Sequence, residues 1–336
     1  MQHRRFFIAF MFFTIAPFFA FMAINIRYDP FYDLAYLTGR PSPTPRTVSH
    51  YAELKYKLVL ARRLAGRRAI VLLGSSTTAA IDPELGRLPS RLPVYNLAFS
   101  NADIHQIESM VHRLAKLSPR LFLVVGLDFF AASAHRTRKF MYLSDDETRA
   151  RADALMRLSS PNTTIDWLNG RGDLGLTFAE RGWRIFTRPR PRVSALRPDP
   201  HGEIRLYNHF ALTPDYRERL RAIARTNPKA RFFISPLHTA HYKLLLELGL
   251  DGLYCDWVQL VHDTVDVVDF SFIPETRDTT HFVDTMHYRA ELGFRLLKTV
   301  LDDEWGQSGF DRERCRASFQ ALHNDGSEQR SSIAAQ

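Results

Sequence analysis

The sequence predicts an α/β fold in which helices cover both faces of a parallel sheet, joined to one apolar N-terminal helix. Two observations predict it. Short apolar runs alternate with segments of helical periodicity from about residue 51 onward, and an uncharged apolar run opens the chain. The 336 residues are 45% hydrophobic and 24% charged, which excludes a disordered, collagen-like or coiled-coil chain.

The N-terminal run extends from Phe6 to Ile24 without a charged residue. About 20 apolar residues span the hydrocarbon core of a bilayer, and a proline such as Pro17 is tolerated in a membrane helix. Arg4 and Arg5 precede the run. The positive-inside tendency therefore places the N-terminus in the cytoplasm and the remaining chain on the other side of the membrane.

Two other interpretations of this run remain. A cleaved signal peptide requires a small-x-small site, and Ala20 and Ala23 do not form a clean A-x-A motif. A buried core helix is disfavoured because a run this apolar on all sides stands at the extreme N-terminus. We therefore predict an uncleaved anchor over residues 1–27. Arg27, after the apolar run, weakens the charge difference on which the predicted orientation depends. A proline-containing linker is predicted over residues 28–50.

The body, residues 51–305, contains apolar runs of strand length, and the first of them ends in glycine. The predicted strands are residues 68–74, 93–99, 120–130, 231–236 and 265–272. Apolar residues at helical spacing predict helices over residues 105–117, 217–227, 241–250 and 288–301. This alternation of strands and helices favours a parallel sheet.

Residues 137–212 interrupt the alternation with many arginine, proline, glycine and tryptophan residues and predict an insertion of helices and loops. Its basic proline-rich stretch, residues 188–202, is typical of a solvated connector, or of a flap over a site for an anionic or sugar polymer. The polar tail, residues 306–336, is expected to be disordered.

Charge and cysteine content limit the function classes. Lys and Arg number 45 against 36 Asp and Glu, which gives a net charge of +9. The arginines are scattered along the chain, so we expect no nucleic-acid partner. Cys255 and Cys315 are the only cysteines, which excludes a disulfide scaffold and a four-cysteine zinc module but leaves a single bridge between them open.

Polar residues follow the first and the last predicted strands, and the carboxyl ends of parallel strands share one edge of a sheet. After the first strand comes Gly74-Ser75-Ser76-Thr77-Thr78. Hydroxyls here can cap the next helix, or one of them can act as a nucleophile beside helix amides that stabilise an oxyanion. The motif of a phosphate-binding loop is absent from this turn.

After the last strand, Asp284 and His287 are three positions apart. Asp284 can bond one imidazole nitrogen and leave the other as a base, which is the orienting half of a catalytic triad. A capping Asp beside a surface His is the alternative. His238, His241 and His281 could add metal ligands, but the spacing is not a regular zinc motif, so we expect no metal and no cofactor.

The combination of a strand ending in a G-S-S turn and a D-x-x-H pair near the C-terminus resembles the SGNH, or GDSL-type, hydrolases over about residues 68–300. The resemblance is to their membrane-anchored envelope branch, which includes proteins of alginate O-acetylation and teichoic-acid D-alanylation. It implies a three-layer, flavodoxin-like parallel sheet. It also implies a triad of Ser76 as nucleophile, His287 as base and Asp284 as its orienter.

The resemblance further implies oxyanion donors. The Ser76 N–H is the first donor, Asn101 stands in the family's second block, and Gly126 with Asp128 stands where the third block has G-x-N-D. An ionised Asp128 donates no hydrogen bond. This indicates that Asp128 is protonated, that it binds substrate hydroxyls, or that catalysis is slow or absent. His238, after the fourth strand, is a candidate for substrate contact or a structural histidine.

These inferences predict a single-pass protein of the bacterial inner membrane with its catalytic domain in the periplasm. The expected activity is that of a serine-dependent esterase or O-acyltransferase, with cell-envelope polysaccharide or an acyl-donor membrane protein as partner. The alternative is a catalytically inactive relative that binds or assembles the machinery of envelope glycan modification.

Overall fold

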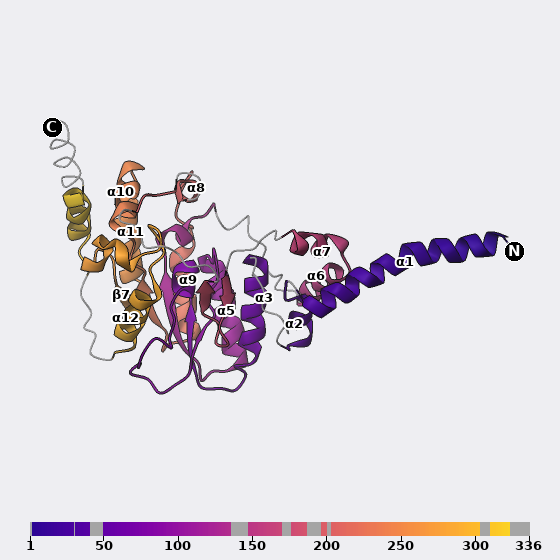
Figure 1. Cartoon of the computed structure of the whole chain (residues 1–336). Coiled ribbons are helices and arrows are strands. Elements are labelled where there is room, and N and C mark those ends of the chain that lie inside the picture. Colours follow the sequence, from indigo (N-terminus) through magenta and orange to yellow (C-terminus); the bar gives the residue numbers. More distant parts are fainter. Residues whose placement is uncertain are drawn as a thin grey trace. The chain divides into compact units, whose positions relative to one another are not determined.

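The computed structural model describes residues 2–29, 31–40, 50–135, 147–169, 176–186, 196–199, 203–302 and 310–322 (Figure 1). The chain divides into two compact units, which we describe separately. Unit 1 comprises Met1–Arg63, Met141–Glu180 and Ile185–Arg188. Unit 2 comprises Leu64–Phe140, Arg181–Arg184 and Pro189–Gln336.

Unit 1 is largely helical. Its helices are α1 (Gln2–Tyr28), α2 (Asp33–Thr38), α3 (His50–Arg62), α6 (Glu147–Leu158) and α7 (Pro161–Leu168). A two-stranded sheet pairs β4 (Leu176–Phe178) with β5 (Arg184–Phe186). Among the described residues, α1 is the one helix long and apolar enough to cross a membrane, with a mean hydropathy of 2.3 in its most apolar window. Its phenylalanines are exposed, which suits a lipid environment.

The C-terminal end of α1 is bound to α6 and α7. The buried Asn25 amide donates to the carbonyl oxygens of Leu158 (3.0 Å) and Ser160 (3.1 Å) and accepts from the Thr164 hydroxyl (2.8 Å). A buried side-chain amide needs such partners, because an unpaired polar group away from water is costly. The end of the apolar helix is therefore part of the folded structure of unit 1.

Part of the segment predicted as a linker is folded. α2 lies within it and is preceded by the buried Asp29, whose carboxylate accepts from the amides of Leu34 (2.8 Å) and Ala35 (2.9 Å). Burial raises the pKa of Asp29 to about 6, although these two amides act to lower it. Asp33 in α2 forms a buried ion pair with Lys55 of α3. The proline-rich residues 41–49 lie outside the described residues.

The main sheet of unit 2 has five parallel strands: β1 (Ile70–Leu73), β2 (Val94–Asn96), β3 (Phe122–Leu127), β6 (Arg231–Ile234) and β7 (Val267–Asp269). Their order is β2-β1-β3-β6-β7. The predicted parallel sheet is therefore confirmed, and each strand lies within a predicted run but is shorter than that run. β1 and β3, buried along most of their length, occupy the middle of the sheet.

The predicted helices are present as α5 (Ile104–Leu117), α9 (Tyr216–Thr226), α10 (Thr239–Glu247) and α12 (Ala290–Leu301). Unit 2 also contains α4 (Ser76–Ala79), α8 (Glu203–Leu206), α11 (Asp251–His262), and the 3₁₀ turns η1 (Phe129–Ala132), η2 (Pro274–Arg277) and η3 (Thr279–His281). Of the predicted insertion, the described part contains α6, α7, β4, β5 and α8, and its basic stretch 188–202 lies mostly outside the described residues.

The hydrophobic core covers both faces of the sheet. On one face, the alternate strand residues Ile70, Leu72, Val124 and Phe233 pack with Leu292 and Leu296 of α12. The intervening residues Val71, Leu123 and Val125 are also buried, as period-2 alternation requires of a two-sided core. Such burial explains why the strands are apolar without interruption.

The prediction of a disordered tail is wrong for part of the tail. Residues 312–322 are helical, and Cys315 forms a disulfide with Cys255 of α11. The helix also buries Phe319, whose ring lies 5.2 Å from that of Phe272. The polar composition of the tail gives no sign of these contacts, because each of them depends on a single residue. Residues 323–336 lie outside the described residues.

Candidate active site

The turn after β1 carries the first group of polar residues. Gly74 has φ +148°, a conformation that side-chain-bearing residues rarely adopt, and a Cβ there would lie 2.9 Å from the Gly126 carbonyl oxygen. Glycine therefore lets the chain reverse close to β3 and begin α4 at Ser76. Ser75 occupies the N-cap position but its side chain makes no capping hydrogen bond, so the capping interpretation fails for Ser75.

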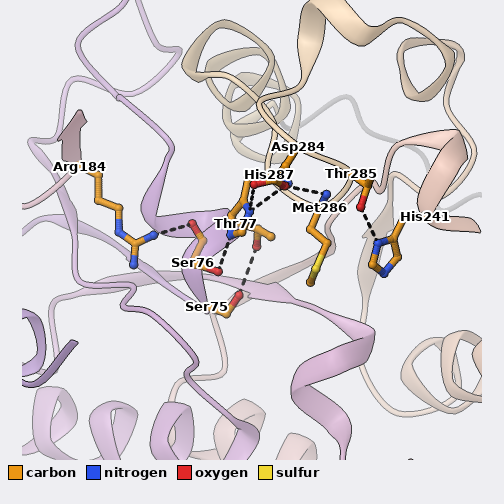
Figure 2. A network of polar contacts seen from close by, with 9 residues as sticks. All are labelled: Ser75, Ser76, Thr77, Arg184, His241, Asp284, Thr285, Met286 and His287. Carbon is orange, nitrogen blue, oxygen red and sulfur yellow. Dashed lines mark hydrogen bonds and ion pairs between the residues drawn. The ribbon is translucent and has the colours of Figure 1, made fainter. Parts of the chain in front are cut away.

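Three residues from the two ends of unit 2 form a connected triad (Figure 2). His287 Nε2 lies 2.8 Å from Ser76 Oγ, and His287 Nδ1 lies 2.9 Å from both carboxylate oxygens of Asp284. The separation of Ser76 and His287 in sequence is 211 positions. The structure thus brings the three predicted catalytic residues together, in the order Ser76, His287 and Asp284 that a nucleophile, a base and its orienter would require.

A closed loop holds Asp284 and His287 in place. Phe282 and Tyr288 form an antiparallel bridge, and the Val283 amide donates to the His287 carbonyl at 2.8 Å. The Asp284 carboxylate accepts from the Met286 amide (2.9 Å) and the His287 amide (2.7 Å), as Figure 2 shows for Met286. These bonds fix the side-chain orientations before any substrate arrives.

Asp284 is ionised in this arrangement. Burial acts to raise the pKa of Asp284, but the adjacent His287 ring and the amides of Met286 and His287 outweigh burial and hold the pKa below its usual value. The side chains of His287 and Asp284 are 28% and 36% exposed. Ser76 is partly exposed as well. A reacting group can therefore approach Ser76 Oγ and the imidazole from solvent.

Asp128 is buried and bound by hydroxyl groups of the turn that carries Ser76. It accepts from Ser75 Oγ (2.5 Å) and from Thr77 Oγ1 (2.8 and 2.9 Å). Burial raises the pKa of Asp128, while the hydroxyl bonds act to lower it. The carboxylate therefore holds the residues on either side of Ser76. This contact explains how the chain accommodates an acid at a position where the resemblance implies a donor.

Arg184 was not singled out by the sequence, yet it contacts the turn that carries Ser76. Its guanidinium donates to the Ser76 carbonyl oxygen at 3.3 Å, as Figure 2 shows. It also donates to the Ser100 hydroxyl, and the side chain is largely buried. The loop after β2 is also joined to the turn by a bond from the Phe99 amide to the Gly74 carbonyl (3.2 Å). Asn101, next to Ser100, is partly exposed and has a left-handed φ of 59°.

Gly126 lies within β3 and pairs with Phe233 of β6. A Cβ at this position would lie 2.7 Å from the Phe233 ring and in contact with the Thr78 hydroxyl. The absence of a side chain therefore lets the α4 turn pack on the sheet. The structure gives Gly126 this packing role, and its predicted part in substrate binding stays a prediction.

His238 has a structural role at the start of α10. Its Nδ1 accepts from the Ala240 amide (3.1 Å), so the side chain caps the helix, and its own amide donates to the Thr285 carbonyl (3.0 Å). Burial lowers the pKa of His238, which favours the neutral ring that this cap requires. Its Nε2 is buried and has no hydrogen-bond partner within the part of the chain that is described. The predicted substrate contact stays a prediction.

A buried histidine supports the triad loop from behind. His241 Nδ1 lies 2.9 Å from Thr285 Oγ1, as Figure 2 shows, and His241 Nε2 lies 2.7 Å from the Tyr207 hydroxyl. Thr285 directly follows Asp284 in the chain. The sequence suggested His241 only as a metal ligand and did not single out Thr285. Nothing in the local sequence shows that these two residues meet.

The described residues contain no group of three or more His, Cys, Asp or Glu side chains that could hold a metal ion. His281 contacts Asp278 instead, at 3.7 Å. Neither a protein-family model nor a curated protein matches this chain.

Proposed function

We propose that this chain is a serine-dependent esterase or O-acyltransferase with an SGNH-like fold, anchored in the membrane by α1. The observation that carries the proposal is the continuous hydrogen-bonded path from Ser76 Oγ through His287 to Asp284. Numbered within the sheet alone, the strand order is 2-1-3-4-5, which agrees with a flavodoxin-like arrangement. The triad lies after the first and the last of these strands, where such sheets bind ligands.

The reaction begins at Ser76. Its Oγ attacks the carbonyl carbon of an ester while its proton moves to His287 Nε2, and Asp284 stabilises the imidazolium that forms. The tetrahedral oxyanion then collapses, the alcohol leaves with the proton from His287, and the acyl group remains on Ser76. Water or a glycan hydroxyl completes the cycle by the same steps in reverse.

The oxyanion donors are the Ser76 amide and Asn101. Arg184 supports this assignment because it ties the Ser76 turn to Ser100, the neighbour of Asn101. A buried guanidinium close to the Ser76 carbonyl also contributes positive potential where negative charge develops. Asp128 is bound by Ser75 and Thr77, so the acid does not by itself argue against catalysis.

The proposed location rests on two features. α1 is long and apolar enough to span a bilayer, and its basic N-terminal residues favour a cytoplasmic N-terminus. The Cys255–Cys315 disulfide suits an oxidising compartment, which for a bacterial inner-membrane protein is the periplasm. Envelope polysaccharide is the substrate class that this location and the resemblance favour.

Covalent labelling tests the proposal. The full chain in neutral detergent is treated with a fluorophosphonate probe and with p-nitrophenyl acetate, because removal of α1 would remove the bonds of Asn25. We expect labelling and acetate release in the wild type and in Ser159→Ala, a control with only a local bond to Met156. Both signals should be lost in Ser76→Ala and His287→Ala.

Absence of labelling in a folded wild type would contradict the serine mechanism. That result would favour the alternative of a glycan-binding or assembly protein that retains the fold. Labelling that persists in Ser76→Ala would place the nucleophile elsewhere.

A further inference from the structure

A pocket lies at the opposite edge of the sheet from the triad. It has a volume of about 610 Å³ and is lined by residues at the starts of β1, β3 and β6 and at the end of α12. The amino ends of parallel strands share one edge, whereas the triad residues follow the carboxyl ends. No part of the proposed reaction uses this pocket, so its composition requires a separate explanation.

Among the described residues, four cations and no acid line the pocket: Arg68, Arg120, Lys229 and Arg231. Arg231 is already engaged, since it donates to the Val300 carbonyl at 2.6 Å and its guanidinium lies 5.5 Å from the Phe122 ring centre. Within the described part of the chain, the side chains of Arg68, Arg120 and Lys229 make no ion pair or hydrogen bond. They are exposed, and each comes from a different loop. Three cations around one pocket create a positive potential that favours an anionic ligand.

The pocket also has apolar walls. Leu92 and Phe122, both partly exposed, line it together with the cations, and the buried Ile70 and Leu301 lie behind them. A small inorganic anion would leave these walls in contact with water, whereas an anion with an attached apolar group would satisfy both kinds of surface. The lining therefore favours an amphipathic anion.

We propose that this pocket binds the phosphate headgroup of an anionic lipid, with part of the glycerol or acyl region against its apolar walls. A lipid is favoured over an anionic polysaccharide because its glycerol and acyl chains offer more apolar surface to the walls than sugar rings do. The same chain carries a helix able to span a bilayer, which keeps lipid headgroups at high effective concentration. The proposal does not depend on the serine chemistry.

A fluorophore at the pocket tests the proposal in the full chain. Both cysteines are in the disulfide, so Ser90→Cys introduces a single reactive thiol at a lining residue. The chain, labelled there with an environment-sensitive dye, is placed in nanodiscs of phosphatidylcholine with increasing phosphatidylglycerol. We expect the emission to shift to shorter wavelength with phosphatidylglycerol and to change little in phosphatidylcholine alone.

Charge variants make the test specific. Each cation near an anionic surface strengthens binding roughly fivefold, so Arg120→Gln with Lys229→Gln should raise the half-maximal phosphatidylglycerol fraction about 25-fold, beyond the accessible range. Arg221→Gln with Arg277→Gln removes two exposed charges that do not line the pocket and should leave the shift unchanged.

Four results would overturn the proposal. These are an equal shift in phosphatidylcholine alone, an equal shift with glycerol phosphate, an equal shift with a soluble anionic polysaccharide, and an unchanged shift in the Arg120/Lys229 variant. The second would identify a site for a free phosphate, and the third a site for a polymer. The lipid proposal is tested by dye emission at residue 90, and the proposed function is tested by labelling at Ser76. A failure of one test is therefore distinguishable from a failure of the other.

Discussion

Asp284→Asn should abolish most of the activity while leaving the loop folded. The amide oxygen of Asn can still accept from the Met286 and His287 amides, which in the wild type lie 2.9 and 2.7 Å from the Asp284 carboxylate. The Asn NH₂ group would face His287 Nδ1, however, and a donor there forces the ring proton onto Nε2. Nε2 would then donate to Ser76 Oγ and could no longer accept its proton.

The expected loss is large because the ring would be held in the wrong tautomer. A comparable Asp→Asn change in a serine triad lowers kcat by about 10⁴-fold, or about 5 kcal/mol of transition-state stabilisation. The assay is the second-order rate of fluorophosphonate labelling, checked by acetate release. Asp278→Asn is the control, since Asp278 also accepts a backbone amide, from Thr280 at 2.8 Å, but does not contact His287. A labelling rate within tenfold of wild type in Asp284→Asn would refute the tautomer argument.

Three further outcomes are expected. Arg184→Met should lower the labelling rate by about 10–10³-fold with little change in stability. The substitution removes the bonds that join the Ser76 turn to Ser100 and removes a positive charge, and an unchanged rate would exclude a role in catalysis. Cys255→Ser opens a closed loop of 60 residues and should lower the free energy of unfolding by about 2–4 kcal/mol in urea, and an equal midpoint with and without the bond would contradict this. Burial lowers the pKa of His238 in the folded state, so at acidic pH the unfolded chain binds a proton more readily than the folded chain. The stability that His238 contributes is therefore lost as pH falls below about 6.5. Unfolding curves at two pH values should show this loss in wild type and a smaller one in His238→Asn, which keeps a capping side chain.

The parallel sheet was predictable because each strand is buried on both faces and so appears as a continuous apolar run. Runs such as residues 68–74 need no long-range information to be recognised. The strand ends were less predictable, since residues such as Phe129 and Phe130 are buried in η1 beyond the end of β3. The apolar pattern records burial, whereas the end of a strand depends on which backbone groups find partners.

The triad residues were predictable because Ser76 and His287 follow the first and last strands, and topology brings such positions to one edge. Arg184 was not predictable, because it reaches the site from the inserted region and no local pattern marks one arginine among many. Asp128 was singled out by the sequence, but its hydrogen bonds from Ser75 and Thr77 were not predictable. Contacts made by single residues distant in sequence leave no periodic signal.

The three bonds of the Asn25 amide have a mechanical consequence. A turn of α1 by one residue moves its side chains by about 100° around the axis and 1.5 Å along it, which would break all three bonds at once. α1 therefore cannot rotate or slide as a loose tether would. If α1 crosses a bilayer, a change in its tilt with membrane thickness would be transmitted through these three bonds to α6 and α7 of unit 1.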